Sequence, residues 1–129
     1  MERSLTLSSD PIREADLVSA AASSERMGAV IRFSGVVRGE EDGAPIRGID
    51  YEAFVPMVER QFGILFDELE TRWPQVGSVR LVHRLGFVAA GEASLWVEVT
   101  APHRGEAFAA CQWLIDRMKQ VVPIWKRPK

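Results

Sequence analysis

The chain has 129 residues, of which 47% are hydrophobic and 26% charged. This balance is ordinary for a soluble globular protein, and the length fits one domain covering residues 1–129. The net charge of −2 argues against general nucleic-acid binding, because phosphate neutralisation needs a basic face. No apolar run approaches the roughly 20 residues that span a bilayer, and residues 1–10 lack the apolar centre of a signal peptide. A single cysteine forms neither an intrachain disulfide nor a cysteine metal cluster, so we expect a cytoplasmic protein.

Residues 8–24, SSDPIREADLVSAAASS, predict a short helix near the N-terminus. Asp10 is a suitable N-cap, and Pro11 fits the first helical position, where its missing N–H is not needed. On this interpretation three apolar side chains turn inward: Ile12, Leu17 and Val18.

The following segment predicts two strands around a loop. Residues 28–39 are apolar and β-branched and end in a glycine, as in a strand that runs into a turn. Residues 39–45, GEEDGAP, are acidic and glycine-rich, which is typical of a mobile loop. Residues 46–54 alternate in polarity and predict a half-buried strand. The alternating residues are Ile49, Tyr51 and Ala53 on one face and Asp50 and Glu52 on the other.

The clearest helix covers residues 56–73, beginning at Pro56 and stopped by Pro74. Its apolar residues recur at spacings of three and four: Val58, Phe62, Leu65, Leu69 and Trp73. Residues 78–88 and 93–100 then predict two strands joined by a turn at 89–92. In the second of these strands, one face is predicted to hold Leu95, Val97 and Val99 and the other Trp96 and Glu98.

A second long helix is predicted at residues 105–120, and Pro123 cannot continue it. Its expected apolar stripe consists of Phe108, Cys111, Leu114, Ile115 and Met118. With a strand ahead of the first helix, the element order is roughly β-α-β-β-α-β-β-α. This order predicts an α+β fold.

The first basic cluster lies where the last strand meets the last helix, in the stretch APHRGE. A helix N-terminus offers unpaired N–H groups and a partial positive charge. Together with the imidazole of His103 and the guanidinium of Arg104, it is suited to a phosphate or a carboxylate. The alternative is that His103 caps the helix and Arg104 is solvated.

The second basic cluster, Lys119, Lys126 and Arg127, is near the end of the chain. All three lysines of the protein, Lys119, Lys126 and Lys129, fall in its last eleven residues. Lys119 in a last helical turn complements the helix dipole, which is the simpler interpretation. The functional alternative is that a partly desolvated lysine beside other cations becomes a better nucleophile or proton donor. Arg38, at a strand end beside the acidic loop, is a third candidate cation.

Other polar residues show weaker signals. His83 lies between apolar strand residues, which favours a structural role. Cys111 falls on the apolar face of a helix, so we expect a buried and inert thiol. The strand carboxylates have no metal-ligand spacing, and no metal site is predicted.

Several motifs occur in order along the chain: GAVIRFSGVVRG, YEAF, HRLG with a following GE, APHR and LIDRMKQVVPIWKR. Together they resemble the large, catalytic subunit of molybdopterin synthase, over most of the chain from Gly28 to Arg127. At one position the chain departs from the usual family pattern, since Pro128 follows WKR where an acidic residue is common.

The resemblance implies an α/β-hammerhead-like mixed sheet with two main helices and a short N-terminal helix. It implies a sulfurtransferase that forms the dithiolene of molybdopterin from cyclic pyranopterin monophosphate in molybdenum cofactor biosynthesis. The sulfur would arrive as a thiocarboxylate on the C-terminus of a small ubiquitin-like subunit. Two large subunits would form a homodimer within a heterotetramer, and no cofactor is required.

The family's functional residues map onto matching positions of this sequence. The resemblance implies Lys119 and Lys126 as catalytic residues. It implies substrate binding by Val36, Val37, Arg38, His103, Arg104, Lys119, Lys126 and Arg127. Because about 22 Å of helix would separate Arg104 from Lys119, we expect a site shared between two subunits, with His103 and Arg104 supplied by the mate.

Two alternatives remain open at the level of sequence. The chain is consistent with a non-catalytic paralogue that binds the small subunit or a pterin phosphate without transferring sulfur. It is also consistent with a dimeric module whose basic end docks an acidic partner.

Overall fold

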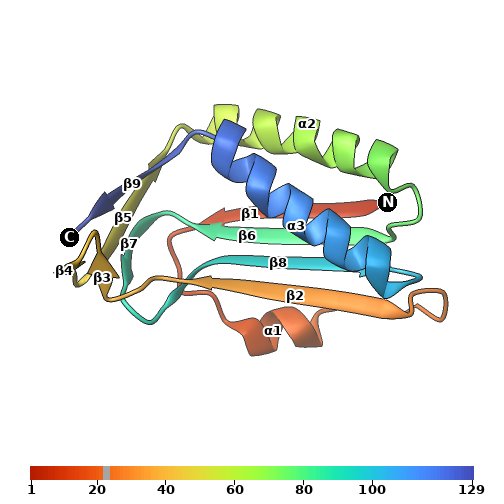
Figure 1. Cartoon of the computed structure of the whole chain (residues 1–129), viewed down its shortest axis with the longest axis horizontal. Coiled ribbons are helices and arrows are strands. Elements are labelled where there is room, and N and C mark those ends of the chain that lie inside the picture. The colour runs from red at the N-terminus through yellow and green to blue at the C-terminus, as the bar shows by residue number, and fades with distance from the viewer. Residues whose placement is uncertain (22–23) are drawn as a thin grey trace.

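The computed structural model describes residues 1–21 and 24–129 (Figure 1). Its elements are β1 (Glu2–Ser8), α1 (Glu14–Ser19), β2 (Ala29–Val36), β3 (Glu40–Glu41), β4 (Ala44–Pro45), β5 (Gly48–Ala53), α2 (Val55–Arg72), β6 (Ser78–Arg84), β7 (Gly86–Ala89), β8 (Ala93–Ala101), α3 (Arg104–Val121) and β9 (Ile124–Pro128). The predicted α+β class is confirmed, with two long helices and a short N-terminal one.

A four-stranded sheet in the order β1-β6-β8-β2 forms the body of the molecule. β1 runs parallel to β6, whereas β8 is antiparallel to both of its neighbours. The two long helices α2 and α3 lie over one face of this sheet (Figure 1). Between them and the sheet is the main core, which includes Phe62, Leu65, Leu69, Val97 and Leu114. The predicted stripe of α2 therefore faces the core, with Trp73 packed at its edge.

The apolar stripe of α3 was predicted only in part. Cys111, Leu114 and Met118 are buried as expected, but Phe108 is 58% exposed. The buried positions before Cys111 are Ala107 and Ala110, which are small enough to let the helix lie close to β8 and β2. Phe108 lies on a solvent-exposed face of the helix beside these alanines. A large apolar side chain was therefore wrongly predicted to be buried in place of two small ones.

The opposite face of the sheet is covered by α1 (Figure 1). Arg80 donates a hydrogen bond to the backbone oxygen of Leu17, and its guanidinium lies 5.0 Å from the ring centre of Trp96. Glu98 accepts hydrogen bonds from both Arg80 and Arg32. Trp96 and Glu98 thus lie on the face away from Val97, as predicted, and are buried there as well.

The predicted start of the N-terminal helix is wrong. α1 begins at Glu14 rather than at Pro11, because the backbone N–H of Asp10 donates to the hydroxyl of Ser8 and closes a turn after β1. Val18 is 41% exposed, so it does not turn inward as expected. Residues 22 and 23 of the predicted segment lie outside the described residues.

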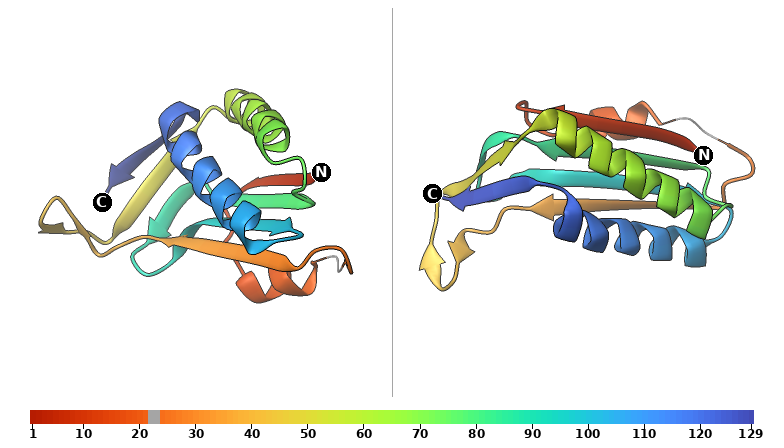
Figure 2. Two further views of the ribbon diagram at one scale, coloured as in Figure 1. Left: turned by 45° about the vertical axis from the view of Figure 1, so that its right-hand side comes forward. Right: turned by 90° about the horizontal axis from the view of Figure 1, so that it is seen from above.

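A second, three-stranded sheet in the order β7-β5-β9 stands at one end of the body (Figure 2). The single strand predicted for residues 78–88 is in fact two strands, because the chain leaves the large sheet after Arg84 and enters the small one at Gly86. Gly86 has a φ of 82°, a left-handed conformation that favours glycine. A small core of Val37, Ile49 and Val88 holds this second sheet.

Two features at this end differ from the predictions. The segment expected to be a loop forms the hairpin β3–β4, whose turn residues Asp42 and Gly43 have φ values of 50° and 81°. The chain also continues past α3 into β9, which pairs antiparallel with β5. This strand was not predicted, although it carries Lys126.

Candidate active site

A cavity of about 560 Å³ opens where the two sheets meet the C-terminal end of α3. Segments far apart in the sequence line it: the end of β2 and the residues after it, β3, β5, β6, β8, α3 and β9. The lining residues are Phe33, Ser34, Gly35, Val36, Val37, Arg38, Glu41, Ile49, Tyr51, His83, Ser94, Leu95, Met118, Lys119, Val122, Ile124 and Lys126. A volume of this size is typical of small-molecule sites.

The residues from Val36 to Arg38 reach the cavity because β2 is irregular at its end. Its register with β8 shifts between Gly35 and Val36, and the chain then turns toward the second sheet. Val37 is held there by two backbone hydrogen bonds, from its N–H to the oxygen of Glu92 and from the N–H of Gly91 to its own oxygen. Its side chain is buried in the small core, while Arg38 lines the cavity.

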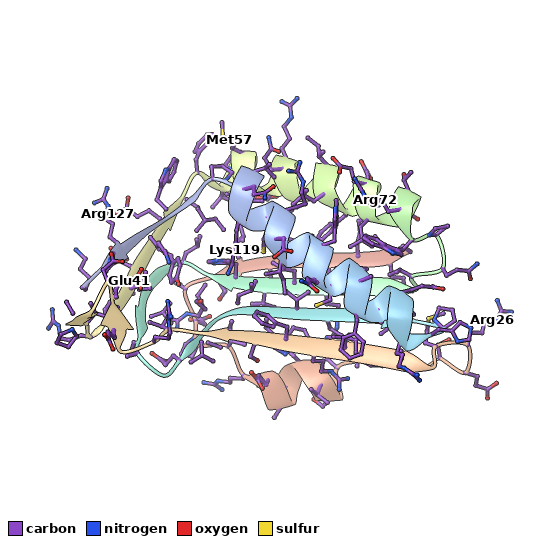
Figure 3. All side chains as sticks on the ribbon, viewed as in Figure 1. Arg26, Glu41, Met57, Arg72, Lys119 and Arg127 are labelled. Atoms are coloured by element: carbon purple, nitrogen blue, oxygen red, sulfur yellow. The ribbon has the colours of Figure 1, made fainter. Side chains whose placement is uncertain are left out.

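The two predicted catalytic lysines are brought to the same cavity by different elements. Lys119 lies in the last turn of α3, at the end of the helix nearest the second sheet (Figure 3). Lys126 lies in β9 opposite Tyr51 of β5, and its Nζ is 3.6 Å from Glu41 of the β3–β4 hairpin. Three cationic side chains, Arg38, Lys119 and Lys126, therefore line one cavity.

Neighbouring residues of β9 point to the other face of the strand, because strand side chains alternate. Ile124 and Lys126 line the cavity, whereas Trp125 is exposed and Arg127 lies 3.5 Å from Glu52. Trp125 therefore forms no part of the cavity wall. Arg127 does not line the cavity of its own chain.

His103 and Arg104 lie at the far end of α3. His103 is the N-cap residue, and its side chain makes no capping hydrogen bond, so the simple capping explanation is not supported. Both side chains are exposed. Since an α-helix rises about 1.5 Å per residue, roughly 22 Å of helix separates Arg104 from Lys119. Within one chain these two groups do not meet on one small molecule.

His83 lines the cavity, which the sequence analysis did not predict. It lies at the end of β6 on the same face as the core residue Leu81, is only 6% exposed and lines the cavity. Its Nδ1 donates a 2.7 Å hydrogen bond to the backbone oxygen of Arg84. Its ring stands edge-on to that of Tyr51, with 5.2 Å between the centres. Burial lowers the pKa of His83, so the ring is neutral near pH 7.

Cys111 is buried in the main core, and burial raises the pKa of its thiol to about 11. It does not line the cavity, in agreement with the expected inert thiol. In the described part of the chain, His, Cys, Asp and Glu form no cluster of three or more arranged to hold a metal ion. None of the helices described is both long and apolar enough to cross a membrane.

Comparison with known proteins shows the family of the chain. A family model described as "MoaE protein" matches residues 7–121. The molybdopterin synthase catalytic subunit of Nostoc sp. is 40% identical over 110 residues, which cover 85% of this chain and 67% of that protein. The chain thus spans about two thirds of the length of that relative.

Solved structures agree with the family match. The crystal structure of molybdopterin synthase from Staphylococcus aureus superposes with a TM-score of 0.87 at 31% identity, covering 96% of this chain and 89% of the other. A protein–protein complex of subunits 1 and 2 of molybdopterin-converting factor from Helicobacter pylori contains a chain with a TM-score of 0.78 at 22% identity, covering 98% and 83% of the two chains. The second likeness shows a shared fold.

Proposed function

Because the chain belongs to the MoaE protein family, whose relatives include molybdopterin synthase catalytic subunits, we propose that it is the catalytic subunit of a molybdopterin synthase. It transfers sulfur from the thiocarboxylated C-terminus of a small ubiquitin-like subunit to cyclic pyranopterin monophosphate, and the product carries a dithiolene. The observation that carries this proposal is the cavity lined by Arg38, Lys119 and Lys126.

The cations suit the two chemical tasks of this reaction. An arginine presents planar N–H donors that match phosphate oxygens, whereas a lysine can lose its proton and act on an acyl group. We assign Arg38 to the phosphate and assign Lys119 and Lys126 to the thiocarboxylate. For Val36 and Val37 the proposed substrate contact rests on the family resemblance and on their place in the cavity wall. The enzyme needs no thiol of its own, since the sulfur comes from the partner, and Cys111 is accordingly buried elsewhere.

The complete site is proposed to need two copies of the chain. His103 and Arg104 form an exposed basic pair at the start of α3, too far from Lys119 in the same subunit. In a two-fold dimer the start of one α3 can lie beside the end of the other, so His103 and Arg104 of the mate complete the phosphate site. For Arg127 a substrate contact rests on the family resemblance alone, since its guanidinium faces Glu52.

The sulfur donor is proposed to enter as a flexible tail. A small subunit would insert its glycine-ended C-terminus into the cavity, whose lysines meet the thiocarboxylate there. The Helicobacter pylori complex of subunits 1 and 2 is consistent with such a partner. Two large and two small subunits would form the working heterotetramer, and the reaction would take place in the cytoplasm.

An in vitro conversion assay tests this function. Purified protein, thiocarboxylated small subunit and cyclic pyranopterin monophosphate are combined, and the dithiolene product is measured after oxidation to a fluorescent pterin. A matched reaction uses a small subunit that lacks its last two glycines, which is expected to give no product. Absence of product with the intact partner would favour a non-catalytic paralogue, whereas product with the truncated partner would refute tail insertion.

A further inference from the structure

The cavity wall contains a neutral hydrogen-bond acceptor on β6 that the proposed chemistry leaves unused. Arg38, Lys119 and Lys126 can only donate hydrogen bonds, and Ser94 already donates to the backbone oxygen of Gly35. Glu41, the one carboxylate of the cavity wall, lies 3.6 Å from Lys126. The residue that β6 contributes to the cavity wall is His83, whose neutral imidazole offers one acceptor nitrogen.

The tautomer of His83 follows from its hydrogen bond. A backbone carbonyl only accepts, so Nδ1, which lies 2.7 Å from the oxygen of Arg84, carries the proton. In the neutral ring the other nitrogen, Nε2, then has a free lone pair. Among residues 1–21 and 24–129, no group donates to Nε2, and Nε2 is not among the fully buried polar atoms that lack a partner. Nε2 is therefore not fully buried, and His83 is among the residues that line the cavity.

The surroundings of His83 keep this lone pair available. The ring is fixed by the Arg84 oxygen on one side and by the edge-on ring of Tyr51 on the other. Burial of the ring disfavours a positive charge on the imidazole and lowers the pKa of His83. An acceptor so oriented is ready for an N–H donor without prior rearrangement.

We propose that Nε2 of His83 accepts a hydrogen bond from a ring N–H or amino group of the bound pterin and so fixes the orientation of the substrate. This inference rests on the proposed function. A pterin phosphate presents acceptors at its phosphate and N–H donors at its ring, so a cavity lined with cations alone would recognise one end of the molecule. His83 supplies the complementary acceptor for the ring end of the substrate, and the ring of Tyr51 stands edge-on beside it.

Two substitutions separate this role from a structural one. In His83→Gln the longer side chain can place an oxygen acceptor near the position of Nε2, but it loses the Nδ1-type donor to Arg84. In His83→Asn the amide can replace that donor, but nothing reaches the cavity. We expect His83→Gln to retain affinity for cyclic pyranopterin monophosphate within about threefold and His83→Asn to lose about tenfold or more, the effect of one hydrogen bond. Titration calorimetry measures both, and thermal unfolding of each variant is recorded alongside.

The opposite order, with Asn retaining affinity and Gln losing it, would show that the Arg84 bond is what matters and would overturn the proposal. Equal affinities in both variants would also overturn it. The wild-type protein provides an independent measurement, because the ¹⁵N resonance of the unprotonated Nε2 should shift when the ligand hydrogen-bonds to it. An unchanged resonance at saturating ligand refutes the contact. Failure of the wild type to bind the ligand at all would instead refute the proposed function.

Discussion

Lys119 and Lys126 both line the cavity, and the residues next to them in the sequence give little sign of this. Lys119 at a helix end has the simple explanation that it complements the helix dipole, yet it lines the cavity. Lys129 carries the same charge only three residues after Lys126, but its side chain is not part of the cavity. Its backbone instead pairs with Arg47 and Gly48.

The three lysines therefore form a matched series. We predict that Lys119→Ala lowers turnover by about 10²-fold or more, a typical loss for a group that takes part in proton transfer. Lys126→Ala should also lower turnover strongly, whereas Lys129→Ala should leave it unchanged. Because the dipole contribution of Lys119 is only about 0.3–1 kcal/mol, its alanine variant should remain folded. Steady-state turnover with thermal unfolding checks this, and near-normal turnover of Lys119→Ala would exclude its catalytic role.

At the level of residues, the sequence predicted the cavity only in part. Arg38, Lys119 and Lys126 were singled out and do share one cavity. His83 was assigned to the core because its neighbours are apolar. That reasoning predicted its burial correctly but missed that a strand end can bury a ring and still expose one nitrogen to a cavity. This position would have been recognised only if the end of β6 at Arg84 had been predicted, whereas residues 78–88 were predicted as one strand.

Among the elements, the connection between β6 and β7 decides how the two sheets are joined. Gly86 and the preceding Leu85 turn the chain from the large sheet into the small one, and the N–H of Leu85 donates to the oxygen of Ser8. Gly86 has a φ of 82°, and a Cβ added there would meet no atom within 4 Å. Its requirement for glycine is thus conformational rather than steric.

Gly86→Ala should lower the free energy of unfolding by about 1–2 kcal/mol, the cost of a left-handed conformation for a residue with a Cβ. Gly63 is the matched control, since it lies within α2 and an added Cβ there also meets no atom within 4 Å. Gly63→Ala should raise the free energy of unfolding by about 0.5–1 kcal/mol, because alanine favours a helix over glycine. Urea unfolding measures both, and changes of equal sign in the two variants would contradict the explanation.

The long helices were predicted almost to the residue, whereas the small sheet was not. Both helices carry the apolar spacing of three and four and are bounded by prolines or a turn, so local signals suffice. β9 pairs with β5, which lies far away in the sequence. β3 and β4 have only two residues each and pair with each other across a two-residue turn. Lys126 opposite Tyr51 is a contact across most of the sequence, which no local pattern reports.

At the scale of the whole molecule, the length of α3 decides whether one subunit can form the complete proposed site. The basic pair at its start and Lys119 near its end lie about 22 Å apart along the axis. A proposed pterin phosphate is much shorter than this. Two copies arranged about a two-fold axis remove the conflict without any change of fold.

Complementation between inactive variants tests this arrangement. Lys119→Ala and His103→Ala proteins, each expected to be inactive, are mixed under conditions of subunit exchange. A mixed dimer holds one site with both residues intact, so random exchange should restore up to about a quarter of wild-type turnover. Exchange is verified by native mass spectrometry.

The matched control mixes Lys119→Ala with a chain carrying both substitutions, a combination in which no dimer has an intact site. It should stay inactive. If exchange is complete and the complementing pair is also inactive, the shared site does not exist.

Side chains alternate between the two faces of β9, and this alternation limits which mutations the segment can accept. Ile124 and Lys126 face the cavity while Trp125 and Arg127 face outward, and only Val122 and Pro123 separate the strand from α3. Substitutions at the outward positions leave the inward pattern intact. An inserted or deleted codon in this junction would instead exchange the two faces, because a shift of one residue reverses every side chain of a strand. Descendants of this sequence can therefore vary here in composition far more readily than in length.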